Sequence, residues 1–144
     1  MVTVKKIEYH ELSVLSELYH QLIGQYSDKA RLHEVYRLIE ADPNYYLLGA
    51  YVDGQLAGSL MGIICYDLVD QCKPFMVIEN VIVSSQAQRK GVGQQLMLRI
   101  EQIARDRECG YIILVSGAQR KEAHLFYEKM GYREEQVEGF RKHL

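Results

Sequence analysis

The sequence lacks several features that would assign it to a specialised class of protein. No apolar run approaches the roughly 18 residues that a membrane-spanning helix needs, and no apolar signal segment follows the charged N-terminus. We therefore expect neither export nor a membrane partner. The three cysteines, Cys65, Cys72 and Cys109, are odd in number and lack metal-ligand spacing. They favour reduced thiols, no bound metal and a cytoplasmic location.

The sequence also has little excess of charge of either sign. The 17 Lys and Arg residues against 19 Asp and Glu residues give a formal net charge of −2. A charge this small provides no protein-wide field that could hold a nucleic-acid backbone. We expect no nucleic-acid partner, and any anion bound at local basic groups such as Arg89 and Lys90 should be small.

Repeats and linkers are absent, and the apolar residues alternate between helical and strand periods over residues 1–144. Asp53-Gly54 predicts a type I′ hairpin turn, and Gly110 is expected to end a helix in the left-handed conformation. The order of elements predicts a single mixed α/β domain. Strands are expected at 2–7, 45–52, 55–66, 74–83 and 111–115 and around Gly139, and helices at 12–23, from about 35 to before Pro43, at 91–107 and at 123–130.

A glycine-containing turn joins the apolar strand at 74–83 to the helix at 91–107. The unpaired N–H groups of a helix N-terminus bind phosphate oxygens, and Gly91 and Gly93 leave their approach open. Gln88, Arg89 and Lys90 add an amide donor and positive charge. The turn therefore predicts a cradle for a pyrophosphate, with a purely architectural role for the glycines as the alternative.

Two common phosphate motifs do not fit this turn. A Walker A loop needs lysine and a hydroxyl residue after its last glycine, where this chain has Gln94 and Gln95. The dinucleotide-binding fingerprint needs a third glycine, where this chain has Leu96. Nucleotide hydrolysis and hydride transfer are therefore disfavoured.

The segments ENVIV (79–83) and QRKGVG (88–93) together resemble the acetyl-CoA-binding signature of the GNAT superfamily of N-acetyltransferases. That signature is Gln or Arg, two residues, Gly, one residue, then Gly or Ala, and Gln88, Gly91 and Gly93 satisfy it. The segment AHLFYEKMGY (123–132) resembles a second family signature further along the chain. RKEAHLFY and the closing GFRKHL are most similar to small-amine members, the aminoalkylphosphonate and aralkylamine N-acetyltransferases.

The resemblance implies an α/β (α+β) fold whose mixed central sheet has about six or seven strands, splayed at its centre, with about four helices. It also implies acetyl-CoA as cosubstrate, no metal, and a homodimer as one assembly that family members adopt. The backbone around Ile82 and Val83 would pair with the pantetheine arm. The cofactor-binding residues it implies are Ile82, Val83, Gln88, Arg89, Lys90, Gly91, Val92, Gly93, Gln94, Arg120, Ala123 and Phe126. Many members have asparagine where this chain has Arg120, which could instead meet a phosphate.

Acetyl transfer to an amine needs a neutral nucleophile and a proton for the departing thiolate. By the resemblance, Tyr127 supplies that proton; the alternative is a core tyrosine on the apolar helix face. Glu79 is the candidate base, because a carboxylate in an apolar strand is costly unless it is paired or functional. The alternative places Glu79 in solvent at a bulge, and Asn80 either orients substrate or forms that bulge.

The predicted function is direct transfer of an acetyl group from acetyl-CoA to a primary amine of a small molecule. The substrate would enter between the helical pair and the strands, near Tyr26, Tyr36, Tyr45 and Tyr66. A protein lysine or N-terminal acetyltransferase is the alternative among enzymes. A non-catalytic acyl-CoA-binding module is the alternative among binding proteins.

Overall fold

The computed structural model describes residues 1–115, 121–132 and 137–144. The chain forms two compact units, Met1–Ile113 and Leu114–Leu144. The first holds nearly all of the sheet and three α-helices, and the second holds the last helix. The organisation of residues 1–144 as one domain remains a prediction.

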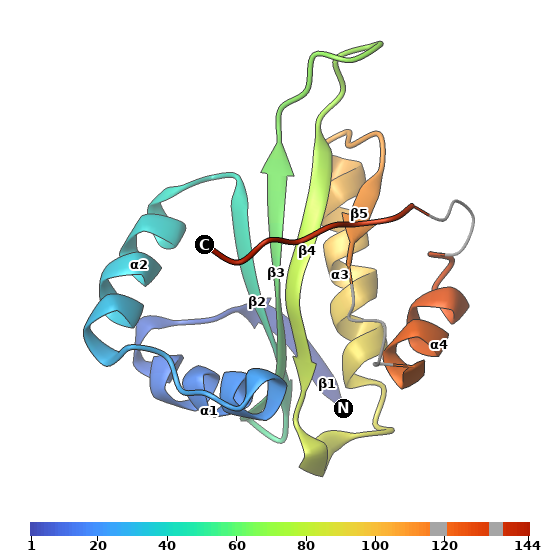
Figure 1. Ribbon diagram of the computed structural model, residues 1–144. Coiled ribbons are helices and arrows are strands. Elements are labelled where there is room, and N and C mark those ends of the chain that lie inside the picture. Colours follow the sequence, from blue (N-terminus) through green and yellow to red (C-terminus); the bar gives the residue numbers. More distant parts are fainter. Residues whose placement is uncertain (116–120, 133–136) are drawn as a thin grey trace. The chain divides into compact units, whose positions relative to one another are not determined.

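The described strands form one sheet in the order β1-β2-β3-β4-β5 (Figure 1). Each of the first three neighbouring pairs is antiparallel. The strands are β1 Val2–Lys6, β2 Tyr45–Val52, β3 Gln55–Cys65, β4 Phe75–Val83 and β5 Ile112–Leu114. The expectation of six or seven strands is wrong for the described residues, because residues 137–144 form no strand.

The β2–β3 hairpin confirms the turn predicted from Asp53-Gly54. Val52 pairs with Gln55 across a two-residue loop, with φ of 50° at Asp53 and 78° at Gly54. A type I′ turn needs positive φ at both positions, which Asp tolerates and Gly adopts freely. Local sequence chemistry therefore sets the register of β2 and β3 next to the turn.

Helices cover both faces of the sheet (Figure 1). α1 and α2 lie on one face and α3 on the other, while α4 belongs to the second unit. The Asp28 carboxylate caps α2 by accepting the Arg31 amide at 2.9 Å, and α2 ends before Pro43 as predicted. The helices are α1 Leu12–Ile23, α2 Lys29–Ala41, α3 Val92–Asp106 and α4 Lys121–Lys129, with short 3₁₀ turns at Tyr9–Glu11 (η1) and Ser85–Ala87 (η2).

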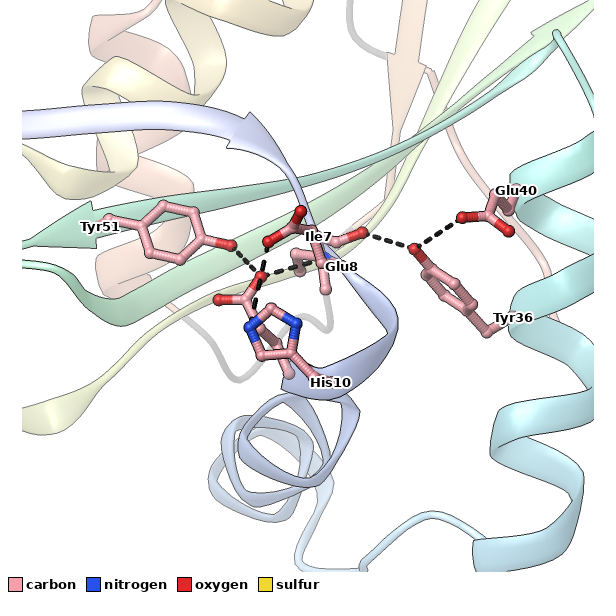
Figure 2. A network of polar contacts seen from close by, with 7 residues as sticks. Ile7, Glu8, His10, Tyr36, Glu40 and Tyr51 are labelled. Atoms are coloured by element: carbon pink, nitrogen blue, oxygen red, sulfur yellow. Dashed lines mark hydrogen bonds and ion pairs between the residues drawn. The ribbon is translucent and has the colours of Figure 1, made fainter.

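An apolar core lies between the sheet and the α1–α2 pair, and two tyrosine hydroxyls form hydrogen bonds beside it. Tyr36 of α2 donates to the Ile7 carbonyl at 2.8 Å, and Tyr51 of β2 donates to the Glu11 carboxylate at 2.7 Å (Figure 2). These bonds fasten the turn after β1 to a helix on one side and to the sheet on the other. The buried residues of this core are Ile7, Leu12, Leu15, Leu18, Tyr36, Leu47 and Ile82.

The α3 face packs closely because β3 presents glycines to the helix. A Cβ at Gly62 would lie 2.6 and 2.9 Å from two carbons of Ile100, and one at Gly58 would lie 2.8 Å from Val92. Ile100 is completely buried and Val92 nearly so. The two glycines therefore fix the distance between α3 and the sheet.

The end of α3 differs from the predicted one. Glu108, with φ of 58°, takes the left-handed conformation that was expected of Gly110. The Cys109 amide reaches back to the Ala104 carbonyl, and the Gly110 amide instead donates to the Pro74 carbonyl at 2.8 Å. Gly110 thus joins the helix end to the start of β4 rather than capping the helix.

We expect Gly62→Ala to lower the free energy of unfolding by about 1–3 kcal/mol, because the methyl group meets a side chain that cannot move aside. Gly110→Ala is the matched control, since its Cβ would meet Lys73 at an ordinary 3.6 Å. That control should change the free energy by less than about 1 kcal/mol. Urea unfolding of both variants measures the difference. Equal stability of Gly62→Ala and the wild type would contradict this packing.

Candidate functional site

A β-bulge interrupts β4 in the middle of the sheet. Ser59 of β3 pairs with Ile82 and Met61 pairs with Glu79, so the single residue between them on β3 faces two residues of β4. The extra residue is Asn80, whose φ is 56°. Asn is one of the few residues other than Gly that tolerate this conformation. The structure therefore confirms the bulge interpretation of Asn80.

The bulge reverses which side chains of β4 face which helices. Met76 lies near the Cβ position of Gly62, on the α3 face, whereas Ile82 belongs to the α1–α2 core. Residues six apart in a regular strand share one face. The extra residue thus lets β4 bury apolar side chains on one face before the bulge and on the other after it.

The Glu79 side chain is exposed. Its predicted burial in an apolar strand is thus wrong, and the alternative, Glu79 in solvent at a bulge, is confirmed. The carboxylate thus incurs no burial cost, and its role as base stays a prediction.

β5 pairs with the beginning of β4 and is too short to extend along its whole length. The Met76 amide donates to the Tyr111 carbonyl at 3.1 Å, and β5 has three residues against nine in β4. Among the pairings that the structure describes, β3 is the strand that pairs with β4 both before and after the bulge.

Residues 84–91, between β4 and α3, form a compact turn that we call the elbow. The Ser84 amide donates to the Ala57 carbonyl at 2.8 Å, the Ser85 amide donates to Gln21 Oε1 at 3.0 Å, and Gln88 Nε2 donates to the Val83 carbonyl at 3.0 Å. These bonds hold the elbow to β3, α1 and β4. The Gln88 side chain therefore braces the elbow.

The elbow ends at Gly91, where α3 begins. Arg89 and Gly91 have φ of 64° and 77°, and a Cβ at Gly91 would meet nothing within 4 Å. The first backbone bond of the helix runs from the Gln95 amide to the Gly91 carbonyl. The N–H groups of residues 91–94 thus have no partner within α3, and the open surroundings of Gly91 favour the approach of an anion.

The elbow brings together the predicted cofactor residues of the first unit. The side chains of Gln88, Arg89, Lys90 and Gln94 are exposed, whereas Val92 is buried against Gly58. Only the backbone amide of Val92 is therefore available to a ligand. Gly93 and Val83 are half-buried, and Ile82 is buried.

The other predicted residues lie in or near the second unit. Ala123, Phe126 and Tyr127 are half-buried on α4. The ring of Tyr127 meets those of Phe126 and Tyr132 edge to face, with centroids 5.4 and 6.2 Å away. Arg120 lies outside the described residues.

A cavity of about 390 Å³ opens between α1, α2 and the sheet. Asn80 of the bulge borders both this cavity and a smaller one beside it. Tyr36 borders the larger and Tyr26 the smaller, whereas Tyr45 and Tyr66, also expected here, border neither. The apolar wall of the larger cavity includes Leu12, Leu15, Leu32, Val35, Ile39 and Leu47.

Tyr19 of α1 borders both cavities and was not among the predicted site residues. Burial raises the pKa of Tyr19 to about 12, so its phenol is neutral at physiological pH. Burial, followed by the neighbouring Glu40 carboxylate, also raises the pKa of Tyr36. Tyr19 lies four positions after Leu15 and three before Leu22, and therefore on the apolar face of α1. This periodicity is the one feature of the sequence that pointed to it.

One group of potential metal ligands occurs among the described residues, at Glu8, His10 and Glu11. Their ligand atoms lie within 4.8 Å of one another around the turn after β1 (Figure 2). Glu11 already accepts the Glu8 amide and the Tyr51 hydroxyl through one carboxylate oxygen. These contacts explain the cluster as part of the turn. Within the same described residues, the helices are too short or too polar to cross a membrane.

Residues 13–132 match the model of the acetyltransferase (GNAT) family. The chain belongs to the GNAT family. An aminoglycoside N(6′)-acetyltransferase type 1 from Acinetobacter genomosp. 13 is 28% identical over 121 residues, covering 81% of this chain and 82% of that protein. The family match and this relative identify the chain as an N-acetyltransferase.

Solved structures share the GNAT fold over the whole chain. A transcriptional regulator from Bacillus halodurans C-125 has a TM-score of 0.93 and 25% identity, with all of both chains covered. The aminoglycoside antibiotic 6′-N-acetyltransferase AAC(6′)-Ih from Acinetobacter baumannii has a TM-score of 0.80 and 22% identity, covering 100% of this chain and 99% of that one. The mixed α+β architecture is thus that of known GNAT proteins.

The raised pKa of Tyr19 predicts a loss of stability at alkaline pH. Between pH 10 and about pH 12 the unfolded chain loses this phenolic proton while the folded chain keeps it. Because the folded state then binds more protons, the free energy of unfolding falls as the pH rises. Tyr19→Phe should lose less stability than the wild type over this range in urea unfolding.

Tyr26→Phe is the matched control, because Tyr26 is 65% exposed. It should keep the wild-type pH dependence. If Tyr19→Phe kept it as well, the burial of the Tyr19 phenol would be disproved.

Proposed function

We propose that this GNAT protein transfers an acetyl group from acetyl-CoA directly to a primary amine of a small molecule. The observation that carries the proposal is the open first turn of α3 behind Gly91, next to the bulged strand β4. GNAT acetyltransferases in general use acetyl-CoA as cosubstrate. The family, the elbow and the bulge together support this cofactor.

The elbow suits the pyrophosphate of CoA. Up to four backbone N–H groups at residues 91–94 can donate to a phosphate, and Gly91 has no side chain that would block it. Arg89 and Lys90, both exposed, add positive charge beside them. In the proposal, therefore, the backbone holds the phosphates and the two cations contribute electrostatic attraction.

The part of β4 after the bulge suits the pantetheine arm. This arm carries amide groups, which pair with backbone N–H and C=O groups as a neighbouring strand does. We propose that the arm runs along β4 near Ile82 and Val83, beside the elbow, where the Val83 carbonyl already accepts Gln88 Nε2 at 3.0 Å. The pantetheine would then lead from the elbow toward the bulge.

In the reaction we propose, the amine nitrogen attacks the thioester carbonyl and the carbon–sulfur bond breaks. The nitrogen gains the acetyl group and loses a proton, and the thiolate of CoA takes up a proton. We assign the first proton transfer to Glu79, whose exposed carboxylate lies beside the bulge. We assign the second to Tyr127, the tyrosine of the second family signature, with Ala123 and Phe126 near the thiol end of the cofactor.

The small-molecule acceptor has support in the names of relatives. The protein at 28% identity is an aminoglycoside acetyltransferase. The cavity bordered by Asn80 is the proposed place for the acceptor, since it adjoins the bulge and the candidate base. A cytoplasmic location, a homodimer and a phosphate contact of Arg120 stay predictions.

Gly91→Ala should weaken acetyl-CoA binding at least about tenfold, because its methyl group would stand before the first turn of α3. Gly24→Ala is the matched control, since Gly24 has a φ of 78°, against 77° at Gly91, lies at a helix end and has equally open surroundings. Both variants should lose about 1–2 kcal/mol of stability through the strained φ. Calorimetric titration with acetyl-CoA separates them, and equal binding by the two would refute the cradle.

Glu79→Gln and Tyr127→Phe should each lower kcat by about 10²–10⁴-fold with the Kd of acetyl-CoA unchanged. Release of free thiol in the presence of a panel of amines measures kcat. Glu17→Gln and Tyr132→Phe are the controls, one on exposed α1 surface and one in ring contact with Tyr127. Full activity in both test variants would remove these catalytic assignments and leave the cofactor site standing.

A further inference from the structure

The cavity between α1, α2 and the sheet is lined mostly by apolar and aromatic residues. Nine of its 13 lining residues are apolar or aromatic, from Leu12 of α1 to Met61 of β3. Its volume of about 390 Å³ lies within the usual range for sites that bury a small molecule. Such walls favour an apolar occupant, because a polar group loses its water there without gaining a partner.

The charges around this cavity nearly cancel. Asp28 already accepts the Arg31 amide at 2.9 Å, and the Arg31 guanidinium lies 3.2 Å from Glu34. The Tyr36 hydroxyl donates its hydrogen bond to the Ile7 carbonyl. The lining therefore has little negative charge to offer a ligand with several ammonium groups.

The lining residues include one carboxylate, Asp28, which caps α2, and the bulge adds that of Glu79 next to Asn80. Asn80 borders the cavity and Glu79 directly precedes it in β4, with both side chains exposed. Because Asp28 already accepts the Arg31 amide, Glu79 is the carboxylate that we pair with one ammonium group. The uncharged polar groups of the lining are the phenols of Tyr19 and Tyr36, the Ser27 hydroxyl and the Asn80 amide.

We infer that the acceptor of this enzyme is a monoamine with a hydrocarbon body, which occupies the cavity while its amine meets Asn80 and Glu79. This inference rests on the proposed function and narrows its substrate class. An aminoglycoside, as in the name of the relative at 28% identity, has several ammonium groups and a body covered with hydroxyl groups. The apolar walls discriminate against such a molecule.

The test compares acceptors and a variant that fills the cavity. A series of monoamines with alkyl or arylalkyl bodies of increasing size, an aminoglycoside and a lysine peptide are assayed for thiol release from acetyl-CoA. Binding of the same amines is measured by calorimetry without acetyl-CoA. The variant is Val35→Phe, which adds volume to the half-buried wall of α2. Its control is Leu38→Phe on the same helix, where the side chain is 68% exposed.

We expect kcat/KM of the best monoamine to exceed that of the aminoglycoside and of the peptide by at least about 100-fold, rising with the size of the hydrocarbon body. Val35→Phe should raise the Kd and KM of the larger monoamines at least about tenfold and leave the Kd of acetyl-CoA unchanged. Leu38→Phe should change neither.

Two results would overturn the inference while acetyl transfer itself stands. One is preferred turnover of the aminoglycoside or the peptide, and the other is equal behaviour of Val35→Phe and Leu38→Phe. If no amine releases thiol, the proposed function fails. The binding arm then decides: monoamine binding that Val35→Phe removes supports the inference, and no binding to the wild type disproves it.

Discussion

The bulge at Asn80 is the constraint on which the rest of this structure depends. One extra residue with φ of 56° shifts the register between β3 and β4. It turns the apolar side chains of β4 from the α3 face to the α1–α2 core and leaves Glu79 and Asn80 exposed between the two. A regular strand would continue one alternation and could not serve both cores. In the proposed enzyme the same residue marks the point where cofactor and acceptor meet.

The two halves of the proposed function depend on different physical interactions. The elbow presents backbone N–H groups and positive charge, which attract an anion whatever molecule carries it. The cavity presents apolar walls and little net charge, which select by shape and by the loss of water. In the proposed function, residues 91–94 bind the cofactor, and the cavity between α1, α2 and the sheet selects the acceptor.

Features set by neighbours in the sequence could be predicted from the sequence. Asp53-Gly54 specified its hairpin, and the apolar period and Pro43 located α3 and the end of α2. Features set by distant partners were left open or missed. The exposure of Glu79 depends on the pairing of β4 with β3, and the role of Gly110 depends on its bond to the Pro74 carbonyl. The tyrosines of the cavity follow the same rule, because only the packing of α1 and α2 on the sheet decides which of them face it.

The central claim is that acetyl-CoA lies along β4 after the bulge with its phosphates at the first turn of α3. Amide chemical-shift mapping of the isotopically labelled protein during a titration with acetyl-CoA tests it most directly. The account predicts the largest shifts at residues 91–94 and in β4 from Asn80 to Val83. Saturable binding with shifts confined to α1 and α2, or no shift at the elbow, would contradict it.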